Sequence, residues 1–199
     1  MNSTKERILE EALVCFAENG YKGTNLRDLA SRLDLSKSAL YRHFTSKEDI
    51  WNAVLDMMGD YYSEHIGNGE NTPITPKNCE ELYTMTMHML DFTMHDKKVI
   101  LTRQLLLTEQ FRDERAKQLA TFHFLTRTRA FYTGVFERMM ECGILKKENA
   151  EMLALSYTAP ITELIHLSDR EPDKEKEVVE EIGSYVRHFI SVYQEDNNG

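Results

Sequence analysis

Residues 24–44 read TNLRDLASRLDLSKSALYRHF, and this stretch decides how the chain folds. Two short apolar stripes with helical spacing are separated in it by the polar turn Asp34-Leu35-Ser36. Asn25 and Ser36 each stand just before a stripe, where a side-chain oxygen accepts hydrogen bonds from the free N–H groups of a helix start. The pattern predicts a helix, a short turn and a second, shorter helix.

The flanking sequence continues the helical pattern in both directions. Ser3 begins a capping-box pattern, Asn19-Gly20 supplies a helix end, and Ser46 is placed to cap the next helix. Residues 67–76 (GNGENTPITP) form the clearest linker, and Thr75 is placed to cap a helix that begins with Pro76. No strand alternation occurs, so the chain is expected to be all-α with about nine helices. Beyond the linker, helical segments are expected at about 76–95, 99–107, 113–142, 148–168 and 173–194.

Composition agrees with long helices and excludes several classes of protein. Nine glycines and four prolines are about half of average usage, which argues against an all-β chain full of tight turns. The longest run without a charged residue, 152–162, is shorter than the ~18 apolar residues of a membrane-spanning helix. Charges also interrupt the N-terminal stretch, so no secretory signal is expected. Three widely spaced cysteines are typical of reduced thiols, and we expect a cytoplasmic protein without a membrane partner.

The net charge of −9 is unevenly distributed along the chain. Residues 1–50 are neutral, so the acidic excess lies in residues 51–199. Within residues 22–47, six basic residues stand against two acidic ones. A basic patch on an acidic body fits contact with phosphates, although charge alone fits a mixed solvated surface equally well.

The second short helix of the motif is polar on one side, as a helix that meets nucleic acid would be. Such a helix enters the major groove, about 12 Å wide, with its N-terminal side chains against base edges. Flanking residues then bond phosphates and set the register. The same pattern also fits a short connecting helix in an ordinary bundle. The candidate DNA-contacting residues are Thr24, Asn25, Arg27, Ser36, Lys37, Ser38, Tyr41, Arg42, His43 and Lys47.

Residues 8–55 closely resemble the DNA-binding domain of the tetracycline-repressor (TetR) family of bacterial transcription regulators. The matching stretches are ILEEALVCFAENGYKGTNLRDLA at 8–30 and LSKSALYRHFTSKEDIWNAVL at 35–55. The resemblance implies a recognition helix at about Ser36–Phe44, and it places Lys47 where the family commonly has a phosphate contact.

Two residues depart from the pattern of the family. Asp34 and Ser38 each stand where glycine is frequent. Aspartate is among the few other residues that tolerate a positive φ, so the turn is expected to survive. Leu40 and Phe44 keep the pattern and are expected to pack inward.

For the whole chain, the resemblance implies a helix-turn-helix DNA-binding domain at 1–47 and a helical effector-binding and dimerisation domain at 48–199. It implies a homodimeric repressor that leaves a palindromic double-stranded operator when it binds a small molecule, with no cofactor. The alternative is a co-regulator of the same fold that acts through a protein partner. No spacing of an enzyme motif such as G-x-G-x-x-G or H-E-x-x-H occurs, so no catalysis is expected.

The helix expected at 76–95 is apolar on two faces, which predicts a central, buried helix. Its methionines and aromatic residues suit the wall of an effector pocket and suit plain core equally well. An inward-pointing Arg127 would favour an anionic ligand or an internal carboxylate, whereas a surface arginine lays its stem on apolar neighbours. The candidate pocket residues are Met85, His88, Met89, Phe92, Phe124, Arg127, Phe131 and Tyr132.

A third face of the same helix is polar and carries Thr84, His88, Asp91 and His95. The outer pair is too far apart for a compact metal site without another helix, so a solvated stripe, or hydrogen bonds to a neighbour, is favoured and no metal is expected.

The last two helices carry broad apolar stripes that fit a dimer interface. Two such helices from each of two subunits would form a four-helix contact, although a single-chain core could use the same residues. The resemblance favours the dimer. The candidate interface residues are Leu164, Ile165, Ile182, Gly183, Val186, Phe189, Ile190 and Tyr193.

Overall fold

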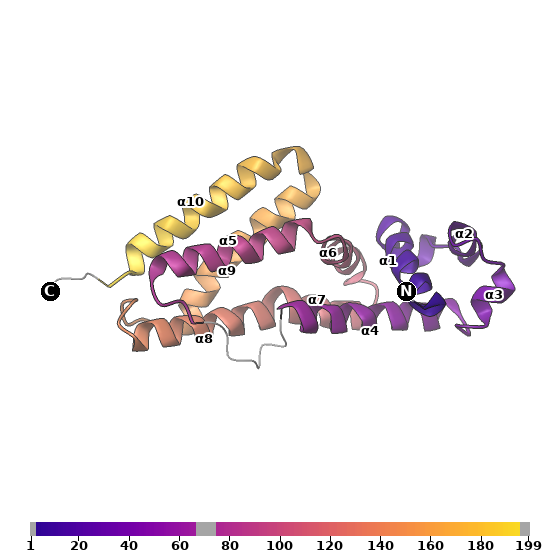
Figure 1. Ribbon diagram of the computed structural model, residues 1–199, viewed down its shortest axis with the longest axis horizontal. Helices are drawn as coiled ribbons and strands as arrows, with labels where there is room; N and C mark the ends of the chain where they lie inside the picture. Colours follow the sequence, from indigo (N-terminus) through magenta and orange to yellow (C-terminus); the bar gives the residue numbers. More distant parts are fainter. Residues whose placement is uncertain (1–2, 67–74, 196–199) are drawn as a thin grey trace. The chain divides into compact units, whose positions relative to one another are not determined.

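A computed structural model describes residues 3–66 and 75–195 of the chain, and these residues are helical almost throughout (Figure 1). The elements are α1 (Thr4–Gly23), α2 (Leu26–Arg32), α3 (Lys37–Tyr41), α4 (Lys47–Ile66), α5 (Cys79–His95), α6 (Lys97–Glu109), α7 (Glu114–Thr121), the π-turn η1 (Phe122–Thr126), α8 (Arg127–Glu141), α9 (Ala150–Arg170), the 3₁₀ turn η2 (Pro172–Lys174) and α10 (Glu175–Tyr193).

The all-α prediction is confirmed. Because α7, η1 and α8 follow one another without a loop, they correspond to the single helix predicted for 113–142. Counted in this way, the described residues form nine α-helical stretches and no strand beyond one isolated bridge. None of these helices is long and apolar enough to cross a membrane. Most of the predicted linker, 67–74, lies outside the described residues.

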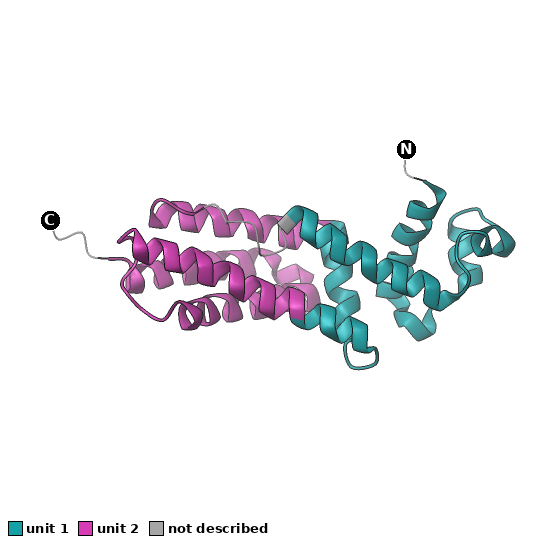
Figure 2. Cartoon of the chain, turned by 90° about the horizontal axis from the view of Figure 1, so that it is seen from below, with its two compact units in different colours: residues 1–68, 97–121 teal, residues 69–96, 122–199 magenta. Residues whose placement is uncertain are grey.

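The chain packs as two compact units, which Figure 2 shows in two colours. The first unit holds residues 1–68 and 97–121, and the second holds 69–96 and 122–199. The first unit therefore joins α4, α6 and α7 to the three N-terminal helices. The predicted boundary after residue 47 separates the residues expected to bind DNA from those expected to bind the effector and to dimerise, and it stays a prediction.

In the first unit, α1 packs along α6 and α4. Ser3 forms the predicted capping box with Glu6 at the start of α1. At the other end, Gly20 has a φ of 68°, which interrupts the helical backbone where the sequence predicted a stop. The rings of Phe16 and Trp51 meet edge to face at 5.1 Å in the core between these helices.

The turn that joins α2 to α3 is built as the sequence predicted. Asp34 adopts a φ of 55°, the left-handed conformation that aspartate tolerates better than most residues. Asn25 Oδ1 accepts the N–H of Arg27 at 2.9 Å, and Ser36 Oγ accepts the N–H of Ala39 at 3.1 Å. Both predicted helix caps are therefore present, as is the cap of Ser46 on α4.

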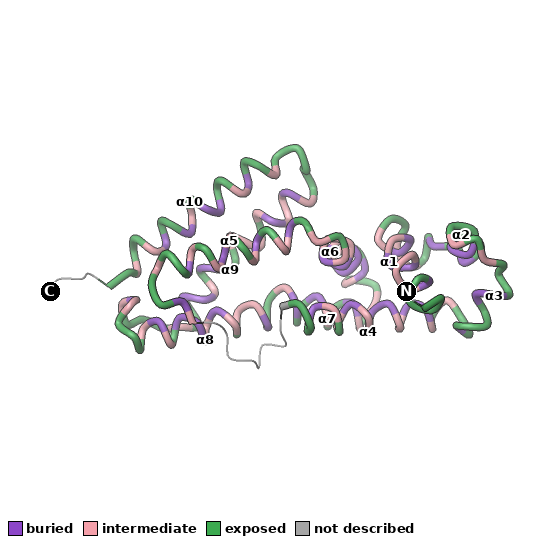
Figure 3. The backbone as a smooth tube through the Cα atoms, viewed as in Figure 1, coloured by how far each residue is buried: buried purple, intermediate pink, exposed green. Residues whose placement is uncertain are grey.

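The second unit is organised around a cluster of aromatic rings, and Figure 3 shows the buried positions recurring along its helices. Tyr157 contacts the rings of Phe136 and Phe189, with centroids at 5.2 and 4.7 Å. The hydroxyl of Thr86 lies 2.7 Å from that of Tyr157 and 3.4 Å from that of Tyr132. The hydroxyl of Thr86 thus joins three helices, α5, α8 and α9, in one buried group of hydroxyls.

The predicted start of α5 is wrong. The helix begins at Cys79, and Asn78 Oδ1 accepts the N–H of Glu81 at 2.8 Å as its cap. Thr75, the predicted cap, instead accepts a hydrogen bond from Nε of Arg138 at 2.7 Å. Asparagine is a stronger cap than threonine, which accounts for the later start.

The residues predicted for a dimer interface on α9 and α10 pack in the core of the chain itself, and their part in a dimer stays a prediction. Five of them are buried: Ile165, Ile182, Gly183, Val186 and Phe189. The other three pack against the same core while partly exposed: Leu164, Ile190 and Tyr193. Apolar stripes signal burial, but they do not say which chain provides the cover.

Candidate nucleic-acid interface

Helix α3 is held by two buried side chains and presents a polar side to solvent. Leu40 is fully buried and Phe44 is 2% exposed, so both pack inward as predicted. The five residues expected to face DNA are all exposed: Lys37, Ser38, Tyr41, Arg42 and His43. The orientation of this helix is therefore the one that the sequence predicted.

Two contacts order the exposed side of α3. Nζ of Lys37 lies 5.7 Å from the ring centroid of Tyr41, within the range of a cation–π contact. The hydroxyls of Ser36 and Ser38 are 2.9 Å apart, and Ser36 also caps the helix. Donors, acceptors and an aromatic ring thus lie together on one exposed surface.

The start of α2 adds further polar groups. Asn25 and Arg27 are both exposed, and the amide N–H₂ group of Asn25 is left to donate because its oxygen caps the helix. Arg32 belongs to the same basic stretch, but it is paired with Glu11 at 3.2 Å and Glu18 at 2.7 Å. The sequence counted Arg32 toward the basic patch, whereas these carboxylates neutralise it.

Thr24 lies differently from the other predicted contacts. It is 5% exposed, and its hydroxyl lies 3.0 Å from the carbonyl of Cys15 and 2.9 Å from that of Gly20. The hydroxyl is therefore used inside the protein, and we remove it from the candidate set. Its polarity suggested a surface contact because threonine is mostly exposed in proteins.

Lys47 is half-buried at the start of α4. Its Nζ lies 4.7 Å from the ring centroid of Tyr21 and 3.4 Å from the carbonyl oxygen of Lys22. Burial lowers the pKa of Lys47, while the charge of Glu109 acts in the opposite direction. Sequence reasoning did not identify Tyr21 or Glu109 as parts of this site.

A second missed group is Lys5, whose Nζ lies 5.4 Å from the ring centroid of Phe44. It is exposed and extends the cationic surface beside α3. Its place on the first turn of α1, far from the motif in sequence, gave no local signal.

The predicted effector residues are spread over different environments in the second unit. Met89 and Tyr132 come together, with the hydroxyl 4.0 Å from the sulfur. His88 is exposed, while Arg127 is 7% exposed. Arg127 is therefore buried, which is one of the two placements that the sequence left open. The remaining candidates are half-buried: Met85, Phe92, Phe124 and Phe131.

Arg127 directly follows the π-turn η1, and His123 within that turn is also buried. Burial and the nearby Arg127 charge lower the pKa of His123 to about 4, so the imidazole is neutral at pH 7. The polar interruption of this helix was visible in the sequence, but the π-turn was not.

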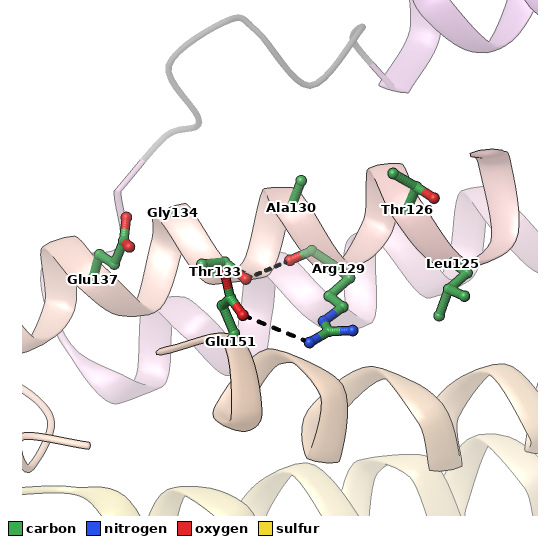
Figure 4. Close-up of a pocket in the computed structure, with 8 residues that line it drawn as sticks. All are labelled: Leu125, Thr126, Arg129, Ala130, Thr133, Gly134, Glu137 and Glu151. Atoms are coloured by element: carbon green, nitrogen blue, oxygen red, sulfur yellow. Dashed lines mark hydrogen bonds and ion pairs between the residues drawn. The ribbon is translucent and has the colours of Figure 1, made fainter. Parts of the chain in front are cut away.

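The described residues of the second unit also form an open groove along α8, which sequence reasoning did not predict (Figure 4). Its volume is about 530 Å³, and an ion pair of 3.9 Å between Arg129 and Glu151 lies in its wall. The lining residues are Leu125, Thr126, Arg129, Ala130, Thr133, Gly134, Glu137 and Glu151. None of the predicted pocket residues lines it.

No group of three or more potential metal ligands occurs among the residues described here. On the polar face of α5, Nδ1 of His95 lies 2.9 Å from Asp91 and its Nε2 lies 3.2 Å from Glu175. His95 is thus exposed and hydrogen-bonded both within α5 and to α10.

Comparison with known proteins supports the interpretation of the N-terminal segment. Residues 8–54 match the family described as bacterial regulatory proteins, tetR family. The biofilm operon icaADBC HTH-type negative transcriptional regulator IcaR of Staphylococcus aureus (strain Newman) is 36% identical over 67 residues, which are 34% of this chain and 36% of IcaR. IcaR of Staphylococcus epidermidis is 31% identical over 62 residues, 31% of this chain and 34% of that protein. The match thus spans about a third of the length of these relatives.

Solved structures extend the similarity of fold to nearly the whole chain. SmeT, the repressor of the Stenotrophomonas maltophilia multidrug efflux pump SmeDEF, aligns with a TM-score of 0.69 at 18% identity, over 98% of this chain and 93% of SmeT. A SmeT–triclosan complex gives 0.73 at 18% identity, over 98% and 94%. The ketosteroid regulator KstR2 of Mycobacterium tuberculosis gives 0.63 at 19% identity, over 98% and 97%. The resemblance of residues 8–54 to the tetR family is thus confirmed by sequence, and the solved structures show that nearly the whole chain shares their fold.

Proposed function

We propose that this chain, whose residues 8–54 match the bacterial regulatory proteins of the tetR family, is a homodimeric transcriptional repressor. It binds a palindromic operator through α3, and a small-molecule effector releases it. It acts by binding and not by catalysis.

The observation that carries this proposal is the orientation of α3. Leu40 and Phe44 anchor the helix in the core of the first unit, so the opposite side is free to enter a major groove. Lys37 and Arg42 offer the donors that guanine prefers, and Ser38 and His43 add further polar groups. A connecting helix would have no need of five exposed polar or aromatic residues within the seven positions 37–43.

Phosphate contacts are assigned to groups that flank α3. Asn25 and Arg27 lie at the start of α2, and Lys47 lies at the start of α4. The first turn of a helix also favours negative charge, because its free N–H groups point outward. These contacts would set the register of the protein on DNA without reading its sequence.

Dimerisation is proposed through the outward side of α9 instead of the buried stripes. Met152, Ser156, Ala159 and Glu163 are exposed at helical spacing on this side. Ser156 and Ala159 are small, which permits close approach of a second helix. The hydroxyl of Tyr185 on α10 donates to the carbonyl of Ser156, so α10 borders the same surface. Ala159→Arg is expected to give monomers in sedimentation equilibrium, whereas Glu141→Ala, at the exposed end of α8, is not.

The effector is proposed to bind in the helical second unit. SmeT, a neighbour of similar fold, has been solved in complex with triclosan, which supports a small organic ligand for this chain. Met89 and Phe92 on α5, with Phe131 on α8, offer adaptable apolar side chains for its wall. An effector lowers operator affinity only by its preference for the conformation that misfits DNA, typically ~1–3 kcal/mol.

The proposal is tested by selecting duplexes from a random library with the full-length protein, followed by footprinting. Two protected half-sites with centres about 34–36 Å apart, or a multiple of that, are expected from a symmetric dimer. The affinity should fall steeply with salt, because phosphate contacts release counterions. Enrichment of no sequence, or binding indifferent to salt, would overturn the proposal.

A further inference from the structure

The last residue of α6, Glu109, reaches the end of α1 within the first unit. Its side chain is buried, and Oε1 accepts the backbone N–H of Tyr21 at 3.1 Å. A Cβ added to Gly20 would lie 2.6 Å from the same oxygen. Glycine is thus required at position 20 for two reasons, the positive φ of this residue and the close approach of the Glu109 carboxylate.

The turn that Glu109 touches sets the start of the DNA-binding motif. The N–H of Thr24 donates to the carbonyl of Gly20 at 3.2 Å, and its hydroxyl lies 2.9 Å from the same oxygen. Asn25, the next residue, caps α2. The placement of Gly20 therefore determines where α2 begins, and α3 follows α2 after one short turn.

Glu109 also bears on Lys47, a proposed phosphate contact. Lys47 Nζ lies over the ring of Tyr21, the residue whose N–H the carboxylate accepts. The negative charge of Glu109 favours the protonated form of Lys47 against the effect of burial. One carboxylate thus acts on the backbone turn through a hydrogen bond and on Lys47 through its charge.

Helix α6 is attached to the N-terminal helices at its other end as well. Lys98 Nζ lies 2.9 Å from Glu10 of α1 and 5.2 Å from the ring centroid of Tyr61 on α4. These groups are more exposed than Glu109, which is buried with an exposed fraction of 3%. Along the chain, α6 directly follows α5, the helix that carries several of the proposed effector residues.

We propose that Glu109 is a positioning residue for operator binding, which couples the placement of α6 to that of α2, α3 and Lys47. Withdrawal of the carboxylate leaves the N–H of Tyr21 without its acceptor and releases the turn at Gly20. Helices α2 and α3 then hold their DNA-contacting groups less well. This inference rests on the proposed function, because its readout is DNA binding.

The test compares wild-type protein with Glu109→Ala, Glu109→Gln, Lys47→Ala and the double variant Glu109→Ala/Lys47→Ala, on a duplex selected by the wild type. Glu114→Gln is the matched control, since Glu114 is an exposed carboxylate on α7 that pairs with Lys117 and Gln118 of its own helix. Each protein is titrated at several salt concentrations, and amide hydrogen exchange is followed at Tyr21.

Glu109→Ala is expected to bind at least tenfold more weakly, with faster exchange at Tyr21. The slope of log K against log salt should fall by about 0.9 per lost Lys47 contact, or about 1.8 for a dimer. Lys47→Ala should give the same change in slope, and the double variant no further change. Glu109→Gln keeps an acceptor and is expected to fold if the alanine variant does not, yet to bind several-fold more weakly. Glu114→Gln should bind as wild type or slightly better, because it removes a negative charge.

Two outcomes would overturn the coupling. Folded Glu109 variants that bind with the affinity and the salt slope of the control would show that the carboxylate does not position α2, α3 and Lys47. Slope changes that add to those of Lys47→Ala would show that it acts elsewhere. If the wild type selects no duplex, the proposed function itself is overturned and the coupling falls with it.

Discussion

Lys37 and Tyr41 lie one turn apart on α3, with the lysine Nζ 5.7 Å from the tyrosine ring centroid, and both side chains are exposed. Neither side chain is needed to hold the helix in place, because Leu40 and Phe44 do so from the other side. This separation of anchoring from exposed residues makes the candidate interface accessible to mutation.

Tyr41→Ala is expected to weaken operator binding by about tenfold, equal to ~1.4 kcal/mol, because the ring is 42% exposed and would lie against DNA. Circular dichroism and sedimentation should be unchanged. Phe111→Ala, which removes an aromatic ring that is 89% exposed on the α6–α7 loop, serves as the control. Unchanged DNA affinity of a folded Tyr41→Ala protein would show that this side of α3 is not the interface.

The buried hydroxyls of the second unit predict unequal costs for two conservative substitutions. Thr86→Val removes the partner of the Tyr157 hydroxyl and leaves it buried, which should lower the free energy of unfolding by ~1–3 kcal/mol. Tyr157→Phe should cost only ~1 kcal/mol, since the Thr86 hydroxyl still has the Leu82 carbonyl at 2.9 Å.

Urea denaturation of both single variants and the double variant measures these costs. The double variant should cost less than the sum of the two, because the groups share one hydrogen bond. Equal single costs that add would mean that the two hydroxyls do not interact.

The cluster at His95 predicts a pH-dependent contribution to stability. Its hydrogen bond to Glu175, with help from Asp91, raises the pKa of His95. A folded-state pKa above the unfolded value gives stability that is present below about pH 6.5 and is lost as the pH rises through the folded pKa.

His95→Gln should therefore lower the free energy of unfolding by about 0.5 kcal/mol at pH 5.5 and have no effect at pH 9. The figure is small because the side chain is half-exposed and solvent screens the pair. His88→Gln on the same helix is the control in urea denaturation at both pH values. A loss of the same size at pH 9 would rule out the charged pair as its cause.

The close packing at Gly183 predicts that a larger side chain is not tolerated at this position of α10. A Cβ there would lie 3.1 Å from the hydroxyl of Tyr83, so α10 and α5 approach closely within one chain. Gly183→Leu should lower the free energy of unfolding by ~1–3 kcal/mol through overpacking. Ser184→Leu, at the exposed neighbouring position, should not. If Gly183→Leu instead dissociates a dimer without destabilising the chain, Gly183 faces a partner after all.

The sequence was sufficient for features that depend on neighbouring residues. The caps at Asn25 and Ser36 and the turn at Asp34 involve groups within a few positions of one another, so their spacing predicts them directly. The inward packing of Leu40 and Phe44 followed from helical periodicity in the same way.

Features that depend on which surfaces meet were missed or left open. Ile182 and Val186 form an apolar stripe that the same chain covers. A stripe covered by a partner subunit would have the same helical spacing, so the sequence does not distinguish the two cases. Glu109 lies 88 positions from Tyr21, and nothing local to either residue indicates that they meet. The groove beside Arg129 likewise depends on α9 reaching α8 with Glu151.

Photocrosslinking from α3 tests most directly whether this helix docks into duplex DNA. Benzoylphenylalanine is incorporated at Tyr41, or at exposed Phe111 as the reference position, and each protein is irradiated with a duplex that the wild type selects. The position of Tyr41 should crosslink to bases within each half-site, and the position of Phe111 should not. Crosslinks from Phe111 and none from Tyr41 would place the DNA elsewhere on the molecule.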